Sequence, residues 1–121
     1  MLDNGSIKIT RYNGNDKIVD IPSEIDGHKV TEIGNSAFIF KPIEQINVPE
    51  GVTSIGSQTF LYCTNLTTVH LPSTVKELDD CVFAHSAVKD INLDAVESVK
   101  GDSLADTPWL GEQKKLSPSL P

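Results

Sequence analysis

The chain has 121 residues, 38% of them hydrophobic and 6% aromatic, so we expect one domain with a mainly aliphatic core. Its 17 Asp and Glu against 10 Lys and Arg give a net charge of −7, which argues against nucleic acid as a partner because phosphates require a basic surface. No segment approaches the roughly 20 apolar residues of a membrane-spanning helix, and the first residues lack the pattern of a signal peptide, so neither is predicted.

The N-terminal part predicts a capping strand over about residues 6–12, because apolar and polar side chains alternate in "SIKITRY". A first structural repeat follows over about 16–42. Seven residues separate Pro22 from Val30 in this repeat, where later repeats have two. Because Asp26-Gly27 is a turn signal, we expect the extra residues, Ser23–Lys29, to bulge into an exposed loop.

The sequence repeats itself. "VTEIGNSAF" (30–38) recurs as "VTSIGSQTF" (52–60), and weaker copies follow as "VKELDDCVF" (75–83) and "VESVKGDSL" (96–104). A fixed period of roughly 20–25 residues is typical of a solenoid, in which each coil buries its apolar face on the next. Further coils, or rungs, are therefore expected over about 43–65, 66–87 and 88–110. The solenoid would span 1–110, and the aperiodic residues 111–121 would form a flexible tail or linker.

Each rung is expected to contain two short parallel strands. In "INV", "VHL" and "INL" the outer residues are apolar and the middle residue is polar, which is the period of a half-buried strand. Pro49 and Pro72 would end these strands, since proline cannot donate to a ladder. The β-branched "Val-x-x-Ile" stretches predict second, shorter strands, with Gly34 and Gly56 at a sharp turn beyond them.

A recurring phenylalanine is expected to build the core. Phe38, Phe60 and Phe83 recur 22 and 23 residues apart, so each should enter the core from a single helical turn and stack on its neighbours. The fourth rung has Leu104 at this position, and Trp109 is expected to cover the open end of the apolar column. The predicted fold class is α/β and β-rich: a right-handed solenoid of about four rungs with short parallel strands and single helical turns.

Polar side chains that point outward from the main sheet are the candidate binding residues. Aligning the rungs places Asp20, Asn47, His70 and Asn92 in one column, and Ile18, Gln45, Thr68 and Asp90 beside it. The predicted binding set is Asp20, Gln45, Asn47, Thr68, His70, Asp90 and Asn92. The alternative is an ordinary polar sheet surface whose side chains satisfy one another.

Chemistry other than binding finds little support in the sequence. The three histidines do not align in one column, and no His/Cys spacing matches a zinc site. Cys63 is expected to be a small core residue, and it does not align with Cys81, so a disulfide is not predicted. No catalytic residue, metal ligand or cofactor is predicted.

The frame of the repeat resembles the BspA-type leucine-rich repeats, which occur largely in surface proteins of bacteria and some protists. The resemblance rests on "INVPEGVTSIGSQTFLYCTNL", "VHLPSTVKEL" and "IPSEIDGHKVTEIGNSAF". The chain departs from the frame at Asp79, Asp80 and Cys81, where the family has glycine and other polar residues. The resemblance implies a curved parallel solenoid at the cell surface or secreted, and protein–protein or host-matrix binding without catalysis.

We therefore expect a binding module for a protein or matrix ligand, with self-association through the open solenoid ends as a further option. Two alternatives stay open. One is a structural spacer between domains. The other is a parallel β-helix enzyme acting on polysaccharide, which is disfavoured because its carboxylates must converge, whereas Asp20 and Asp90 are three rungs apart.

Overall fold

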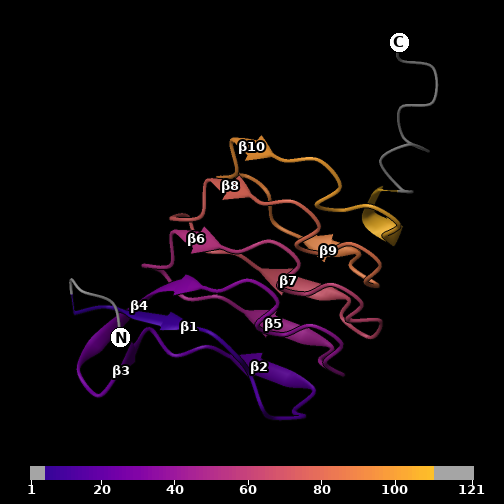
Figure 1. Cartoon of the computed structure of the whole chain (residues 1–121). Coiled ribbons are helices and arrows are strands. Elements are labelled where there is room, and N and C mark those ends of the chain that lie inside the picture. Colours follow the sequence, from indigo (N-terminus) through magenta and orange to yellow (C-terminus); the bar gives the residue numbers. More distant parts are fainter. Residues whose placement is uncertain (1–4, 111–121) are drawn as a thin grey trace.

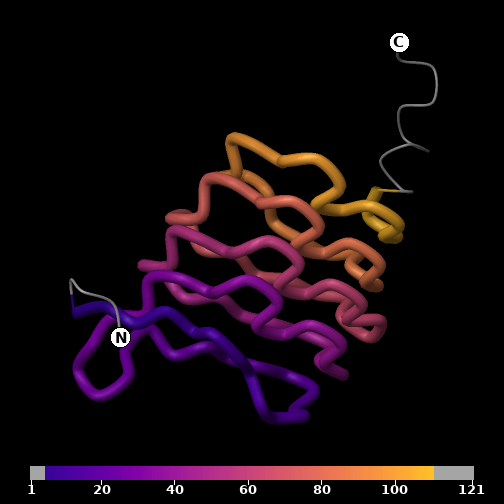
Figure 2. Tube along the Cα trace, viewed as in Figure 1, coloured from indigo at the N-terminus to yellow at the C-terminus, as the bar shows by residue number. Residues whose placement is uncertain are grey.

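The computed structural model describes residues 5–110, in which the chain coils about four times into a solenoid with very little helix (Figures 1 and 2). Each coil lies on the one before it, so residues about 22 apart in the sequence are neighbours in space. Within the described range only residues 108–110 are helical, and all other regular structure consists of short strands. The tail expected over 111–121 lies outside the described residues.

The main sheet consists of one parallel strand from each rung. In spatial order these are β2 (Ile18–Asp20), β5 (Gln45–Asn47), β7 (Thr68–His70) and β9 (Asp90–Ile91). The register pairs Val19 with Ile46, Ile46 with Val69, and Val69 with Ile91. The first three of these side chains are buried and Ile91 is half-buried. The predicted period of two is thereby confirmed, and the polar neighbours point outward.

A second, less regular set of strands lies opposite the main sheet. β4 (His28–Ile33) pairs in parallel with both β1 (Ile7–Ile9) and β6 (Ser54–Ile55), while β8 (Glu77–Leu78) pairs in parallel with β10 (Ser98–Val99). β1 lies in the segment where a capping strand was expected. No ladder joins β6 to β8 among the described residues, so this side is interrupted between the second and third rungs.

The glycines after these strands have a different role from the predicted one. Neither Gly34 nor Gly56 has a positive φ, so a left-handed turn does not require them. Instead, a Cβ on Gly56 would lie 2.6 Å from the backbone nitrogen of Asn35 and 2.9 Å from the carbonyl carbon of Gly34. Glycine lets the two rungs approach closely here. Asp79 occupies the equivalent position in the next rung, beside the interruption between β6 and β8.

The insertion in the first rung is a hairpin, which corrects the expected loop. β3 (Glu24–Ile25) pairs antiparallel with the start of β4, so that Glu24 faces Lys29 and Ile25 faces His28. Asp26 and Gly27 form the two-residue turn with φ of 53° and 81°. Two central residues with positive φ are the geometry that Asp-Gly favours between strands. The hairpin remains exposed, as expected.

The segment that carries the recurring phenylalanine is a succession of turns, where we expected a single helical turn. Along this segment every second backbone N–H bonds to a carbonyl three residues earlier and closes a turn. The N–H groups between them donate to carbonyl groups of the next rung. The Phe38, Phe60 and Phe83 N–H groups donate to Thr59, Val82 and Ser103 at 2.9, 2.8 and 2.8 Å. This third side therefore binds each rung to its neighbour as the strands do.

The core contains the predicted stack of rings. Phe38 stacks on Phe60 and Phe60 on Phe83, each pair with ring centroids 5.1 Å apart. Tyr12, from the segment before the first rung, adds a fourth ring 5.0 Å from Phe38 and closes the N-terminal end of the column. Stacking is confirmed, and aliphatic side chains from both sets of strands surround the rings.

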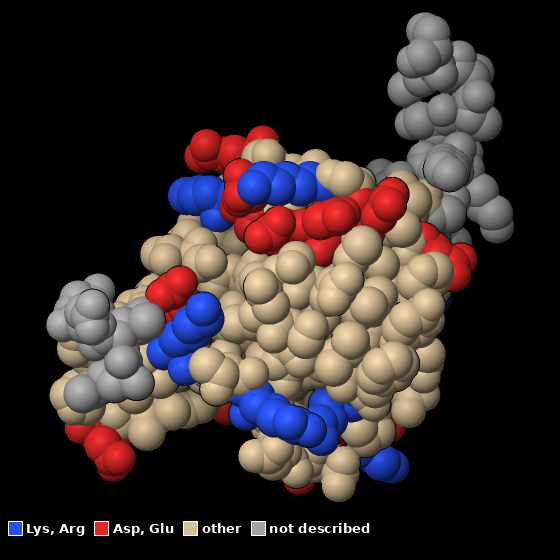
Figure 3. Space-filling model, in the orientation of Figure 1, with Lys and Arg blue, Asp and Glu red and all other residues tan. Residues whose placement is uncertain are grey.

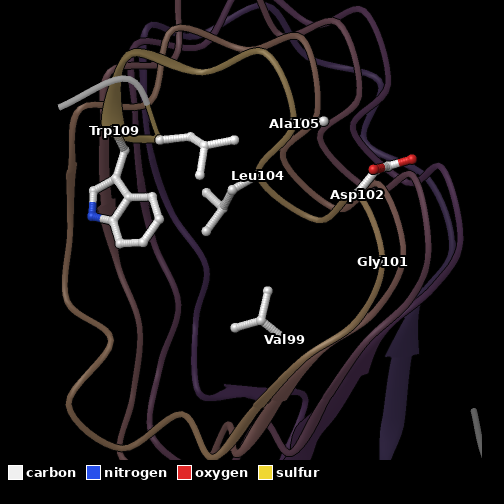
Figure 4. Close-up of a pocket in the computed structure, with 7 residues that line it drawn as sticks. Val99, Gly101, Asp102, Leu104, Ala105 and Trp109 are labelled. Atoms are coloured by element: carbon white, nitrogen blue, oxygen red, sulfur yellow. The ribbon is translucent and has the colours of Figure 1, made fainter. Parts of the chain in front are cut away.

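The C-terminal end of the core is only partly covered. Trp109 packs against the core, and its backbone N–H donates to the Val88 carbonyl at 2.9 Å. Figure 4 shows its indole beside Leu104 and Val99 within the last coil. A hollow of about 220 Å³ nevertheless remains among them, and Val99 is 49% exposed. Trp109 thus shields this end without sealing it.

Candidate binding surfaces

The outward face of the main sheet carries the predicted binding residues in two columns. Asp20 pairs with Asn47 and Asn47 with His70 across neighbouring strands. In the second column the partners are Ile18, Gln45, Thr68 and Asp90. The columns are those expected from the repeat alignment, except that β9 ends before Asn92, and the strand spacing fixes their side chains about 4.8 Å apart.

The first column forms a hydrogen-bonded chain. The Asn47 amide donates to Asp20, and the Asn47 Oδ1 lies 2.7 Å from His70 Nδ1 and 3.2 Å from Gln45 Nε2. Because Oδ1 can only accept, His70 Nδ1 carries the proton, and a neutral ring then offers Nε2 as an acceptor. Asn47 is thus held by its neighbours, in keeping with the alternative that these side chains satisfy one another, while outer atoms of the column remain exposed.

Asn92 is exposed beside these residues but is bonded differently. Its Oδ1 accepts from the Leu71 N–H at 2.7 Å and its Nδ2 donates to the Leu71 carbonyl at 2.8 Å. The side chain continues the ladder where β9 ends, so both polar atoms are used within the fold. Sequence alignment could not reveal this, because the residue is polar and correctly spaced.

The C-terminal end of the sheet face is hollowed. A depression of about 400 Å³ is lined by His70, Lys89, Asp90, Asn92 and Trp109, among others. Trp109 therefore has a second role that sequence reasoning missed: it forms a wall beside the candidate residues. A single tryptophan in the chain was the signal available for it.

A second exposed column was also missed. The rings of Phe40 and Tyr62 are parallel within 2° at 5.3 Å, and Tyr62 stacks on His85 at 4.9 Å. His85 Nδ1 in turn lies 2.9 Å from Asp106 Oδ2. All four residues have φ between 56° and 62°, an unusual conformation for side chains of this size. They recur 22, 23 and 21 residues apart, so the repeat alignment already contained the signal.

A cluster of Asp80, Cys81 and Asp102 is the one group within residues 5–110 whose side chains could approach a metal ion together. The Asp80 carboxylate is already engaged: its Oδ1 accepts from the backbone N–H of Asp102 at 2.9 Å, and the Cys81 thiol lies 3.6 Å from the same oxygen. Burial and the adjacent Asp80 carboxylate raise the pKa of Cys81. The cluster is therefore a turn closure at the departure from the repeat frame.

Cys63 is buried in the core, as predicted, and both cysteines are free thiols. The Cys63 thiol donates to the Phe38 carbonyl at 3.0 Å, and burial raises its pKa to about 11. The folded chain therefore retains this proton at pH values where the unfolded chain has lost it. Stability should therefore fall as the pH rises from the ordinary thiol pKa of 9.0 towards the folded value of about 11.

We expect wild type to lose about 2 kcal/mol more than a Cys63→Ser variant when urea unfolding is compared at pH 8 and pH 10.5, since each pH unit in this window costs about 1.4 kcal/mol. Serine is a suitable replacement because Ser86 occupies this position one rung later and donates to the Phe83 carbonyl. Cys81→Ser is the comparison: the pKa of this thiol is raised less than that of Cys63, so its removal should reduce the pH dependence by a smaller amount than Cys63→Ser does. Equal losses in wild type and Cys63→Ser would contradict the assignment.

Residues 7–107 match the family model for the BspA type leucine rich repeat region, described with 6 copies. The chain belongs to the BspA-type leucine-rich-repeat family. Repeats of this family suggest a protein-interaction module, and the family and its structural neighbours are typically non-catalytic. It is a bacterial surface family. No helix within residues 5–110 has the length and apolar character needed to cross a bilayer.

Solved structures of other leucine-rich-repeat proteins share the fold. One from Bacteroides ovatus has a TM-score of 0.77 at 24% identity, over 88% of this chain and 30% of that one. One from Bacteroides capillosus has a TM-score of 0.65 at 25% identity, over 84% of this chain and 91% of that one. The T. pallidum leucine-rich-repeat protein has a TM-score of 0.67 at 25% identity, over 88% of this chain and 62% of that one. The chain thus spans less than a third of the B. ovatus protein. No curated protein is significantly similar to it.

Proposed function

We propose that this BspA-type chain is a non-catalytic module of a cell-surface or secreted protein, and that it binds a protein of the host or its matrix on the outward face of β2, β5, β7 and β9. The observation that supports the proposal is the in-register display of polar side chains on this face. The proposed contact residues are Asp20, Gln45, Asn47, Thr68, His70 and Asp90.

The sheet favours binding because its contact residues are already ordered. Strand pairing fixes the backbone, and the hydrogen bonds of Asn47 with Asp20 and His70 fix the side chains. Binding then costs little further conformational entropy. Four rungs at about 4.8 Å spacing nevertheless give a face only about 15–20 Å tall, so one copy should bind with modest affinity.

Charge indicates the kind of ligand. Asp20 and Asp90 lie at the two ends of the face, and the chain as a whole carries −7. A protein with a neutral or basic contact surface is therefore favoured, and exposed charges of this kind predict weaker association at higher salt.

We expect a matrix or surface protein from an array of purified ligands to bind wild type, and His70→Ala and Asn47→Ala to weaken that binding by about tenfold, as loss of a well-placed polar contact does. Lys76→Ala is the matched control, because Lys76 is exposed on the opposite side, directly before β8. Equal effects of all three substitutions would contradict the proposed face. Absence of binding to every protein on the array would favour a structural spacer.

A further inference from the structure

The exposed ring column ends in an uncovered aromatic face. Tyr62 covers one face of Phe40, yet Phe40 is 68% exposed, and no ring within residues 5–110 stacks on its other face. The core column has Tyr12 before Phe38, but the residue two positions after Tyr12 is Gly14, which has no ring to place before Phe40. The repeat therefore leaves a stacking position empty at the N-terminal end of this column.

A hollow of about 450 Å³ borders Phe40, within the size range of small-molecule sites. Its lining includes two cations, Arg11 and Lys41, and no carboxylate. The Lys41 ammonium lies 5.9 Å from the centroid of the Tyr12 ring, a cation–π contact that helps to hold it. In a chain of net charge −7 such a lining is unusual, and in Figure 3 acidic side chains gather at the opposite, C-terminal end of the molecule.

Polar groups that can bind hydroxyls complete the lining. Thr10, Asn35 and Ser36 contribute to the same hollow. The Asn35 Oδ1 accepts from the Ser57 N–H at 2.9 Å, which fixes the amide and leaves its Nδ2 to donate. The hollow thus combines a flat apolar face, two positive charges and several hydrogen-bonding groups.

We propose that this hollow binds an acidic sugar residue, a pyranose that carries a carboxylate, as the terminal unit of a glycan. The C–H face of the ring would stack on the open face of Phe40, and its hydroxyls would bond to Thr10, Asn35 or Ser36. The carboxylate would pair with Arg11, whose guanidinium can bind it through two parallel hydrogen bonds, and with Lys41. An aromatic acid would use the ring and the cations but would leave the hydroxyl-binding groups without partners.

The backbone around Phe40 suits such a site. Phe40 is held at a φ of 62°, and its N–H donates to the Leu61 carbonyl at 3.1 Å in the next rung. The ring is therefore presented outward by a fixed scaffold and is stacked from behind by Tyr62. The same φ recurs at the equivalent positions Tyr62, His85 and Asp106, so the geometry of the repeat places the ring outside the core. This hollow is separate from the sheet face proposed above.

Amide chemical shifts of the isotope-labelled chain test the proposal. Titration with methyl β-glucuronide should shift the amides of residues 10–12 and 35–41 with a Kd of about 1 mM, as expected for a ligand of this size. Methyl β-glucoside, in which a neutral hydroxymethyl group replaces the carboxylate, should bind at least about tenfold more weakly, because it cannot form the charge-assisted hydrogen bonds.

Variants locate the site and separate it from the sheet. Phe40→Leu keeps an apolar side chain but removes the flat face, and Arg11→Ala with Lys41→Ala removes the charge. Each variant should weaken glucuronide binding at least about fivefold. Lys29→Ala, which removes a cation from the hairpin, and His70→Ala, on the sheet face, should leave it unchanged, so this proposal and the preceding one can fail independently.

Four outcomes would overturn the proposal. They are no shift at about ten times the expected Kd, equal affinity for glucuronide and glucoside, unchanged binding in Phe40→Leu, and binding of benzoate as tight as that of the glucuronide. The last would show that the hollow selects an aromatic acid and not a sugar. Well-dispersed spectra of the variants over residues 43–93 would show that the solenoid is intact.

Discussion

Replacing Phe60 by alanine should lower the free energy of unfolding by about 3–5 kcal/mol. The Phe60 ring is fully buried and is stacked on both faces, by Phe38 at 5.1 Å and by Phe83 at 5.1 Å. Its loss would open a cavity at the centre of the column that neither neighbour can fill, because each is fixed by its own rung. Equilibrium unfolding in urea measures the effect.

Phe40→Ala is the matched control for this substitution. It removes the same atoms, but from an exposed ring with one stacking partner, so only about 0.5–1.5 kcal/mol should be lost. Comparable losses for the two variants would show that the core column of rings contributes no more to stability than the exposed column does. A small loss for Phe40→Ala would also show that the ring is not retained for stability.

Gly56→Ala should destabilise the chain by about 1–3 kcal/mol or more, because its methyl group has no space. A Cβ at this position lies 2.6 Å from the Asn35 nitrogen and 2.9 Å from the Gly34 carbonyl carbon, and backbone atoms cannot move aside as a flexible side chain would. The two rungs must separate, which strains the 2.8 Å bond from the Gly56 N–H to Ile33. Urea unfolding and hydrogen exchange of the Gly56 amide report the two effects.

Gly27→Ala distinguishes crowding from backbone strain. Gly27 has a φ of 81° but nothing within 4 Å of its added Cβ, so alanine there meets only the conformational cost of about 1–2 kcal/mol. If Gly56→Ala were tolerated better than Gly27→Ala, close approach of the rungs would not be the reason for the glycine.

The parts of the fold that repeat were predictable from the sequence. Phe38, Phe60 and Phe83 stack because equal spacing along the chain becomes vertical alignment once each rung has the same path. The alternation in "INV" and "VHL" fixed which side chains face the core, because a one-residue slip would have exposed Ile46 and Val69.

The parts that depend on contact between rungs were not predictable. Gly56 was assigned to a turn, but its role comes from the distance to Asn35, which a one-dimensional pattern does not contain. Asn92 has the spacing of a surface residue, yet its amide bonds to the Leu71 backbone. The hairpin at Asp26-Gly27 was within reach, since the turn signal was noted but its two flanking strands were not.

Of the two candidate sites, one was predictable from the sequence and the other was not. The sheet columns follow from the alternation, whereas the exposed rings of Phe40 and Tyr62 were overlooked because they fall in a segment taken for a helical turn. Phe40 keeps an uncovered face because the residue that could stack on it, Gly14, has no side chain. This becomes visible only when the rungs are superimposed in space.

The interruption between β6 and β8 bears on how the molecule opens. In a solenoid, stability is a sum over rungs and over the contacts between successive rungs, so a weakened contact divides the chain into two cooperative units. The last rung contains Leu104 and the exposed Val99 and has no further rung to cover it. The last two rungs should therefore unfold locally as a block before the first two. Asn47 and His70 lie on either side of that joint. A ligand that held both residues together would bridge this joint and raise its resistance to local unfolding.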